Sequence, residues 1–337
     1  MNRLVIAWMV LGVLGLSGAC GSLFVGAGSL DDADLATTFL RLRAGRLATA
    51  FLAGAALGTA GVLVQGLFRN PLASPSVIGT TAGASFGGTV ALVLGETLSA
   101  GAAASTLGST LGGVARELWL PLGCLGGALF GLCVLLVVTS RYPSGLVLLL
   151  TGFILSSLFL SATSLLSSIA QESWALGRAV VAFMLGGVDA KGAHHVALAA
   201  PLVVGGVIAA VGFRRHLDLL LSGEEEAASL GVDVRRVRRW VIIWAAALTA
   251  AAVSIGGSVS FVGLVVPHAL RPFVGHGHGH LIPASFFGGG VFLICADVLA
   301  RLAPTQGELP LGVVTGFVGA PLFLWLLLRG ARQGRVA

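Results

Sequence analysis

Charged residues divide the chain into long uncharged segments separated by short charged ones. Each uncharged segment has about the ~20 residues that a helix needs to cross a lipid bilayer. None alternates apolar and polar residues with a period of two, as outer-membrane strands do, so each is predicted to be a helix. The first runs from Leu4 to Leu30. Seven more are Leu47 to Phe68, Ser74 to Gly95, Leu118 to Ser140, Leu146 to Ser168, Gly192 to Phe213, Pro272 to Ala296 and Leu309 to Leu328.

The first segment shares features with a targeting signal. It begins MNRL, with one basic residue, and the small residues Ser17 to Cys20 (SGAC) faintly resemble a lipoprotein cleavage site. However, its uncharged run is longer than the ~7–15 apolar residues of a signal peptide. We therefore expect a retained first transmembrane helix.

A further uncharged segment, Trp240 to Leu270, allows two arrangements. Its 31 residues form either one tilted helix or two passes broken at Ile255 to Ser258 (IGGS). With the break and a cytoplasmic N-terminus, thirteen basic residues lie inside and seven outside, whereas an unbroken run leaves ten on each side. Because cytoplasmic loops are rich in Arg and Lys, the break is favoured, and it predicts ten transmembrane helices with both termini cytoplasmic. Non-helical backbone at membrane depth must be buried in protein or line a cavity, so the break also indicates a pathway.

The composition supports an integral membrane protein and excludes a water-soluble globule. Hydrophobic residues make up 56% of the 337 residues, against roughly 45–50% in soluble proteins. The net charge of +6 therefore concerns membrane orientation rather than nucleic acid. Spaced glycines indicate close helix packing, and they lie at Gly54 to Gly58, Gly79 to Gly87, Gly123 to Gly131 and Gly312 to Gly316.

One segment, Leu221 to Trp240, differs sharply from the apolar chain around it. It reads LSGEEEAASLGVDVRRVRRW, whereas charged residues make up only 10% of the whole chain. Ser222 can cap a short helix whose first turn is acidic and which stops at Gly231. This helix is predicted on the cytoplasmic surface, and by charge pattern alone it is either a partner-binding element or a solvated loop helix.

LSGEEEAASLGVDVRRVR closely resembles the coupling segment of FecCD-type ABC transporter permeases, which import ferric siderophores, haem and cobalamin. Four other segments resemble that family in order and spacing, so the resemblance covers nearly the whole chain. They are Arg41 to Ala84, Leu148 to Ser168, Ser260 to Arg271 (SFVGLVVPHALR) and Ala296 to Leu327. One departure is Arg43 to Arg46, which reads RAGR where the family commonly has RLPR, so a proline that stiffens the start of the second helix is missing.

The resemblance implies an all-α, type II ABC importer permease with one transmembrane domain, residues 1–337, in the inner membrane of a bacterium. It implies a second permease copy as a homodimer, two cytoplasmic ATPase subunits that bind ATP and Mg, and an extracytoplasmic substrate-binding protein. This chain contains no GxxxxGK[ST] nucleotide motif, so it is expected to be non-catalytic, with no cofactor and no nucleic acid of its own. Residues 222–237 form the coupling segment, and its expected ATPase contacts are Ser222, Gly223, Glu224, Glu225, Glu226, Leu230 and Gly231.

The resemblance also implies two further sites. The fifth span would line the translocation path, with a gate at Ser144 and Gly145 and a hydroxyl face of Ser161, Thr163, Ser164 and Ser167. Alternatively, these hydroxyls bond back to their own helix carbonyls. Arg43, Arg46 and Arg301 match residues that dock carboxylates of the binding protein, because a guanidinium can grip a carboxylate with two hydrogen bonds. Interfacial snorkelling is the alternative for these arginines.

Other polar residues are assigned no site. His276, His278 and His280 alternate with glycines in a cytoplasmic loop and could bind a transition metal, but the expectation is no metal site. Asp297 and Arg301 lie four residues apart and can pair. An ion-coupled secondary transporter remains as an alternative class, although such proteins place ionisable residues near the membrane centre and these spans have almost none. A ferric siderophore is the expected cargo, and haem and cobalamin stay open.

Overall fold

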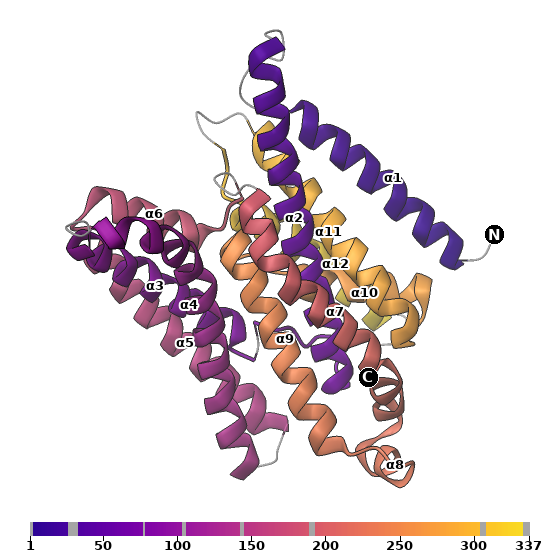
Figure 1. Cartoon of the computed structure of the whole chain (residues 1–337). Coiled ribbons are helices and arrows are strands. Elements are labelled where there is room, and N and C mark those ends of the chain that lie inside the picture. The colour runs from indigo at the N-terminus through magenta and orange to yellow at the C-terminus, as the bar shows by residue number, and fades with distance from the viewer. Residues whose placement is uncertain are drawn as a thin grey trace.

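The computed structural model describes residues 3–25, 33–76, 78–102, 106–141, 145–188, 193–303 and 308–332, and these ranges contain helices and connecting turns without any strand. The all-α prediction is confirmed (Figure 1). In the described part of the chain the helices are α1 (Arg3–Phe24), α2 (Ala33–Leu67), α3 (Thr80–Ala102), α4 (Thr106–Arg141), α5 (Gly145–Ala170), α6 (Trp174–Leu185), α7 (Ala193–Ser222), α8 (Glu224–Ser229), α9 (Val234–Gly256), α10 (Val262–Val274), α11 (His278–Leu302) and α12 (Leu311–Arg332).

The bundle has two ends, which we call the α8 face and the opposite face. Within the described ranges, eight helices are long and apolar enough to cross a membrane: α1, α2, α4, α5, α7, α9, α11 and α12. Helix α3, of 23 residues, packs against α4, and α10, a shorter apolar helix of 13 residues, packs against α11. Together they agree with the predicted ten passes. Two short helices lie at the ends, α8 on the face named after it and α6 on the opposite face.

The predicted break in the long apolar segment is confirmed. Helix α9 ends at Gly256, and Gly257 and Phe261 both have positive φ, at 68° and 67°. At the break, the Ser258 amide donates to the Phe183 carbonyl in the last turn of α6. Helix α10 then returns to the α8 face, because the next helix begins at His278 beside Asp218 of α7. Sequence analysis placed the break within two residues of its observed position.

The most buried helices are α2, α9 and α11, and glycine contacts explain how closely they pack. In α2, a Cβ on Gly54 would lie 2.1 Å from the Gly289 carbonyl oxygen, and one on Gly61 would lie 1.9 Å from that of Gly263. Helices α3 and α4 approach in the same way at Gly87 and Gly123. Because only hydrogen fits at these contacts, the predicted small-residue seams are confirmed there. Gly316 of the fourth motif has no neighbour within 4 Å and forms no seam.

Several helix bounds differ from the sequence prediction; α4, for example, begins at Thr106 instead of Leu118. Helix α2 begins at Ala33, well before the predicted Leu47, and continues through Arg43 to Arg46. The stretch RAGR lacks the family's proline, so nothing interrupts the backbone hydrogen bonds at this point. Helix α6 was not predicted, because its 12 residues are too few for a span and Arg178 interrupts its apolar pattern.

Candidate functional site

The charged segment forms a turn and a six-residue helix on the α8 face. Ser222 was predicted to cap this helix, but it is the last residue of α7, and Gly223, at φ 135°, occupies the N-cap position without a side-chain bond. Residues with a side chain rarely adopt this backbone conformation, so glycine is strongly favoured at position 223. A polar hollow of about 510 Å³ lies at this turn, lined by Ser222 to Glu226 and Arg69.

Helix α8 presents both acidic and apolar groups at this face. Leu230 is 62% exposed, and Gly231, at φ 87°, ends the helix as predicted. Glu224 pairs with Arg238 of α9, and the Asp233 carboxylate accepts the Arg236 amide at the start of α9. The predicted coupling residues thus lie together on one exposed surface. Sequence reasoning missed Arg69, which reaches this hollow from the end of α2 with an unusual φ of 50°.

A buried histidine connects three helices beneath this surface. The backbone amide of His278 donates to Asp218 Oδ1 at 2.8 Å, and the ring Nδ1 lies 2.6 Å from the same oxygen. Because a carboxylate only accepts, Nδ1 carries the proton. The other ring nitrogen, Nε2, lies against Gly66 of α2, where a Cβ would be 2.3 Å away. His276 and His280 are exposed, and the described residues contain no cluster of three potential metal ligands.

The first turn of α10, directly after the break, is held from α2. The side-chain amide of Gln65 is 1% exposed and donates to the Gly263 and Leu264 carbonyls, at 3.4 and 3.3 Å. Glycine at position 263 also lets α10 approach Gly61. Of the non-helical residues of the break, Gly257 and Val259 are buried, whereas Ser260 is exposed, so the break is only partly covered within one chain.

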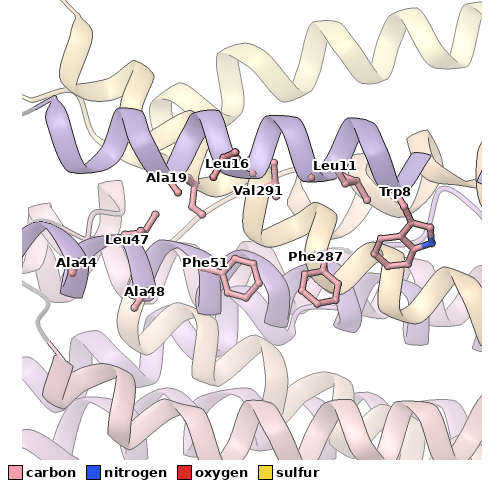
Figure 2. A pocket seen from close by; sticks show the side chains of 13 residues that line it. Trp8, Leu11, Leu16, Ala19, Ala44, Leu47, Ala48, Phe51, Phe287 and Val291 are labelled. Carbon is pink, nitrogen blue, oxygen red and sulfur yellow. The ribbon is translucent and has the colours of Figure 1, made fainter. Parts of the chain in front are cut away.

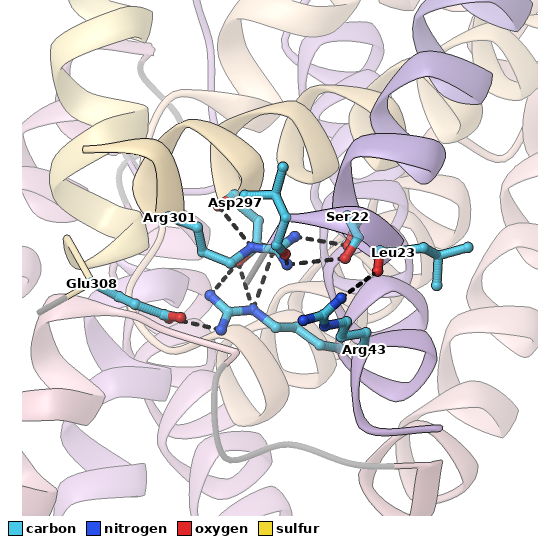
Figure 3. Close-up of polar contacts among 8 residues, drawn as sticks. Ser22, Leu23, Arg43, Asp297, Arg301 and Glu308 are labelled. Carbon is cyan, nitrogen blue, oxygen red and sulfur yellow. Dashed lines mark hydrogen bonds and ion pairs between the residues drawn. The ribbon is translucent and has the colours of Figure 1, made fainter. Parts of the chain in front are cut away.

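At the opposite face, the three predicted arginines form a polar network with the C-terminus of α1 and with Asp297. Figure 3 shows Arg43, Arg301 and Asp297 in this network. Arg43 donates to the Leu23 carbonyl at 2.8 Å, and Arg301 donates to the Ser22 and Val25 carbonyls at 3.0 and 2.6 Å. The last carbonyls of a helix have no partner within it and carry partial negative charge. The two guanidinium groups therefore cap the C-terminus of α1 and fasten it to α2 and α11.

Asp297 lies at the centre of this network with a side chain that is 2% exposed. Arg46 grips it through Nε and Nη2, at 3.0 and 2.8 Å from Oδ1, and Arg301 Nη2 lies 2.8 Å from Oδ2. The predicted pair of Asp297 and Arg301 is confirmed. Arg46 Nη1 lies 2.7 Å from Glu308, whose side chain is 37% exposed. Glu308 precedes α12 in a short non-helical stretch, and no sequence signal connected it to Arg46.

The arginines thus lie together, but each guanidinium group contacts its own chain. Arg43 is 7% exposed, and the Arg46 and Arg301 side chains are 12% and 3% exposed. Simple interfacial snorkelling does not describe these buried groups, of which Arg46 and Arg301 are ion-paired and Arg43 is bonded to a helix carbonyl. Glu308 is the most exposed member, so a carboxylate from another protein would meet Arg46 on the side where Glu308 lies.

The α5 hydroxyls do not share one face. Ser161 and Ser164 are exposed, whereas Thr163 and Ser167 are 2% and 8% exposed. Thr163 and Ser164 also donate to helix carbonyls one turn earlier, at 2.7 and 2.9 Å. Exposed leucines directly adjoin these serines in the sequence, Leu160 before Ser161 and Leu165 after Ser164. Gly145 begins α5, and Ser144 lies outside the described residues.

A family model described as the FecCD transport family matches residues 4–329. The chain belongs to the FecCD transport family. It is an integral membrane permease, and this assignment disfavours the alternative of an ion-coupled secondary transporter.

The alignments of this permease with individual relatives cover most of both chains. It is 36% identical to the Fe(3+) dicitrate permease FecD of Escherichia coli, over 86% of this chain and 85% of the relative. It is 32% identical to the hemin permease HmuU of Yersinia pestis, over 94% and 93%. A solved inward-facing structure of a metal-chelate type ABC transporter superposes with a TM-score of 0.80, at 30% identity and over 95% and 98% of the two chains.

Proposed function

We propose that this permease is the membrane subunit of an ATP-driven importer that moves an iron chelate, most simply a ferric siderophore. The observation that supports this most directly is the relationship to the ferric dicitrate permease over 86% of the chain. Haem is the second candidate, because the hemin permease matches over 94% of the chain. A bulky chelate needs a path with weakly polar walls, and the exposed part of α5 is uncharged.

The α8 face is proposed to bind two cytoplasmic ATPase subunits per transporter, one for each permease copy. Two features support this assignment: the exposed Leu230 and the acidic first turn of α8. A loop helix without a partner would gain no stability from a leucine that is exposed to water, so the exposure of Leu230 favours contact with another protein. ATP and Mg would bind to the ATPase. We therefore propose that the α8 face and both termini lie in the cytoplasm of a bacterium, with the protein in its inner membrane.

The exposed face of α5 is proposed to pair with a second copy of this chain around the translocation path. Phe153, Ile154, Leu158 and Leu165 are each more than 60% exposed on this helix. Ser161 and Ser164 lie among them and would give the path its hydroxyl groups. Thr163 and Ser167, being buried within one chain, would support the helix rather than contact the chelate.

The binding protein is proposed to dock at the opposite face, over the network of Arg43, Arg46 and Arg301. Docking carboxylates would compete with Glu308 for the outer edge of Arg46, since Asp297 occupies the inner edge. Charge reversal of Arg46 or Arg301 is a poor test, because a new carboxylate beside Asp297 would destabilise the fold. Glu308 gives a cleaner test because it is half-exposed.

The test of this function is transport by the reconstituted complex. The permease, its ATPase and its binding protein are placed in proteoliposomes, and uptake of labelled ferric siderophores, ferric citrate, haem and cobalamin is compared. ATP-dependent accumulation of a ferric chelate is expected. Accumulation of haem or cobalamin alone would replace the proposed cargo, and uptake driven by an ion gradient without ATP would contradict the proposal.

A further inference from the structure

An apolar crevice lies between α1 and α2, with α11 as its floor (Figure 2). Its volume is about 740 Å³. Leu11 and Leu16 extend from α1, Leu47 and Phe51 from α2, and Val291 lies between them. All of the lining residues belong to helices long and apolar enough to cross a membrane.

The packing of α1 explains why this space remains open. A Cβ on Gly15 or Gly18 would lie 3.1 Å from Val291 or Ile294, so α1 follows α11 closely. Toward α2, the small residues Ala44 and Ala48 leave space beside Leu47 and Phe51. In the most apolar stretch of α1, only 6% of the residues are buried, against 83% for α2. The crevice is therefore open to the lipid side.

Contacts of α1 with its neighbours close both ends of the crevice, with α11 at one end and with α2 at the other. At one end, Trp8 packs edge-on against Phe287, with ring centroids 5.8 Å apart. At the other, Arg43 donates to the Leu23 carbonyl. The lining of α1 runs from Trp8 to Ala19, about 16 Å at the ~1.5 Å rise of a helix. One leaflet of hydrocarbon is about 15 Å thick, half of the ~30 Å bilayer core, so the length suits one acyl chain.

The residues that line the crevice favour lipid over water as its occupant. A buried water needs two to four polar partners, and the crevice wall offers side chains of Ala, Leu, Ile, Val, Phe and Trp with glycine between them. An acyl chain, by contrast, gains dispersion contacts with every wall. Apolar space that opens to hydrocarbon is therefore filled by lipid.

Arg41 lies where the phosphate of a lipid bound in the crevice would be expected. It is exposed, and it precedes Ala44 and Ala48 by three and seven residues, so all three lie on the crevice side of α2. Side chains of a helix tilt toward its N-terminus, which directs Arg41 away from the crevice and toward the membrane surface. We propose that this crevice is a phospholipid site, with one acyl chain between α1 and α2 and the phosphate at Arg41.

Native mass spectrometry of the detergent-purified chain, loaded from vesicles of phosphatidylglycerol and phosphatidylethanolamine, tests the site. We expect one phospholipid per chain to survive washing with lipid-free detergent. Gly12→Phe should remove it by filling the crevice, because a Cβ on Gly12 has no neighbour within 4 Å. Gly212→Phe on α7 is the matched control, since Gly212 has equally open surroundings outside the crevice, and it should keep the lipid. Arg41→Gln should reduce retention roughly fivefold, as expected for one basic group near a phosphate.

Lipids with brominated acyl chains provide a second readout, through quenching of Trp8 fluorescence, measured as the difference between the wild type and Trp8→Phe. Quenching that persists at low lipid ratios in wild type and Gly212→Phe, and is lost in Gly12→Phe, is expected. The proposal is overturned if no phospholipid is retained or if both glycine variants retain it equally. It is also overturned if Trp8 is protected in a dimer, because a second copy of the chain would then occupy the crevice.

Discussion

The ring of His278 lies 2.6 Å from the Asp218 carboxylate, and this contact joins the start of α11 to the last turns of α7. Helix α7 leads directly into α8, and the same ring lies against Gly66 of α2. A displacement of α8 by a bound ATPase would therefore reach both α11 and α2 through one side chain. Asp218 and His278 are thus placed to couple the α8 face to the interior of the bundle.

Replacing Asp218 with Ala should uncouple ATP hydrolysis from uptake. The variant removes the acceptor of two hydrogen bonds from His278, so movement of α7 would no longer be transmitted to α11. We expect uptake to fall about tenfold, equivalent to ~1.4 kcal/mol of lost coupling, while basal ATP hydrolysis continues. Arg214→Gln, an exposed change one turn earlier, is the control. Equal uptake by both variants in proteoliposomes would contradict a coupling role.

Leu230→Glu should abolish uptake and ligand-stimulated ATP hydrolysis without unfolding the permease. Because Leu230 is 62% exposed, the substitution changes little within this chain, and surface changes usually alter stability by less than about 0.5 kcal/mol. A charge in an apolar ATPase contact would prevent binding, whereas Leu230→Met should preserve it. Co-purification of the ATPase with each variant gives the measurement, and unchanged binding by Leu230→Glu would place the coupling surface elsewhere.

Asp297→Ala should be strongly destabilising. It leaves Arg46 and Arg301 buried without their shared carboxylate, and removal of one partner from a buried ion pair costs about 3–5 kcal/mol. Glu308→Gln is the matched comparison on the same arginine, and its half-exposed pair should cost no more than about 1 kcal/mol. Thermal unfolding in detergent measures both. Similar Tm values for the two variants would show that Asp297 does not hold the network together.

Glu308→Gln should also change docking of the binding protein. Without its carboxylate, the outer edge of Arg46 is free for a carboxylate of the partner, so association should become faster and more sensitive to salt. Surface plasmon resonance at low and high ionic strength provides the rates, with Glu172→Gln, an exposed acid in the turn before α6, as the control. Association rates that match the wild type in every salt concentration would contradict docking at Arg46.

Cysteine substitution distinguishes the two sides of α5. Cysteines at Ser161 and Ser164 should react with a small water-soluble thiol reagent in at least one nucleotide state, since both positions are exposed in the single chain. Cysteines at Thr163 and Ser167 should be protected, since these residues are buried within the chain. The comparison is made in a background lacking the four native cysteines. Protection of Ser161 and Ser164 in every state would indicate that α5 does not line the path.

The sequence by itself determined the membrane helices and their approximate number, because the bilayer sets a minimum length for each apolar segment. Each bilayer crossing needs about 20 uncharged residues, so spans such as Leu118 to Ser140 can be recognised without any knowledge of their neighbours. The break near Gly257 was also favoured by the sequence alone, because with an extra pass more of the arginines fall on the cytoplasmic side. The acidic first turn and the glycine stop likewise define α8 from within its own segment.

Only the tertiary structure decided which polar groups meet. Arg46 and Asp297 are separated by 251 positions, and neither residue's surroundings in the sequence indicate the other. Asp218 and His278 are 60 positions apart. From the sequence alone His278 could be a metal ligand, whereas in the structure it is buried and bonded to Asp218. The separation of Ser161 and Ser164 from Thr163 and Ser167 also depends on which helices cover α5. Long-range pairing depends on how helices pack, and local residue patterns such as spaced glycines show which faces can pack closely but not which helices meet.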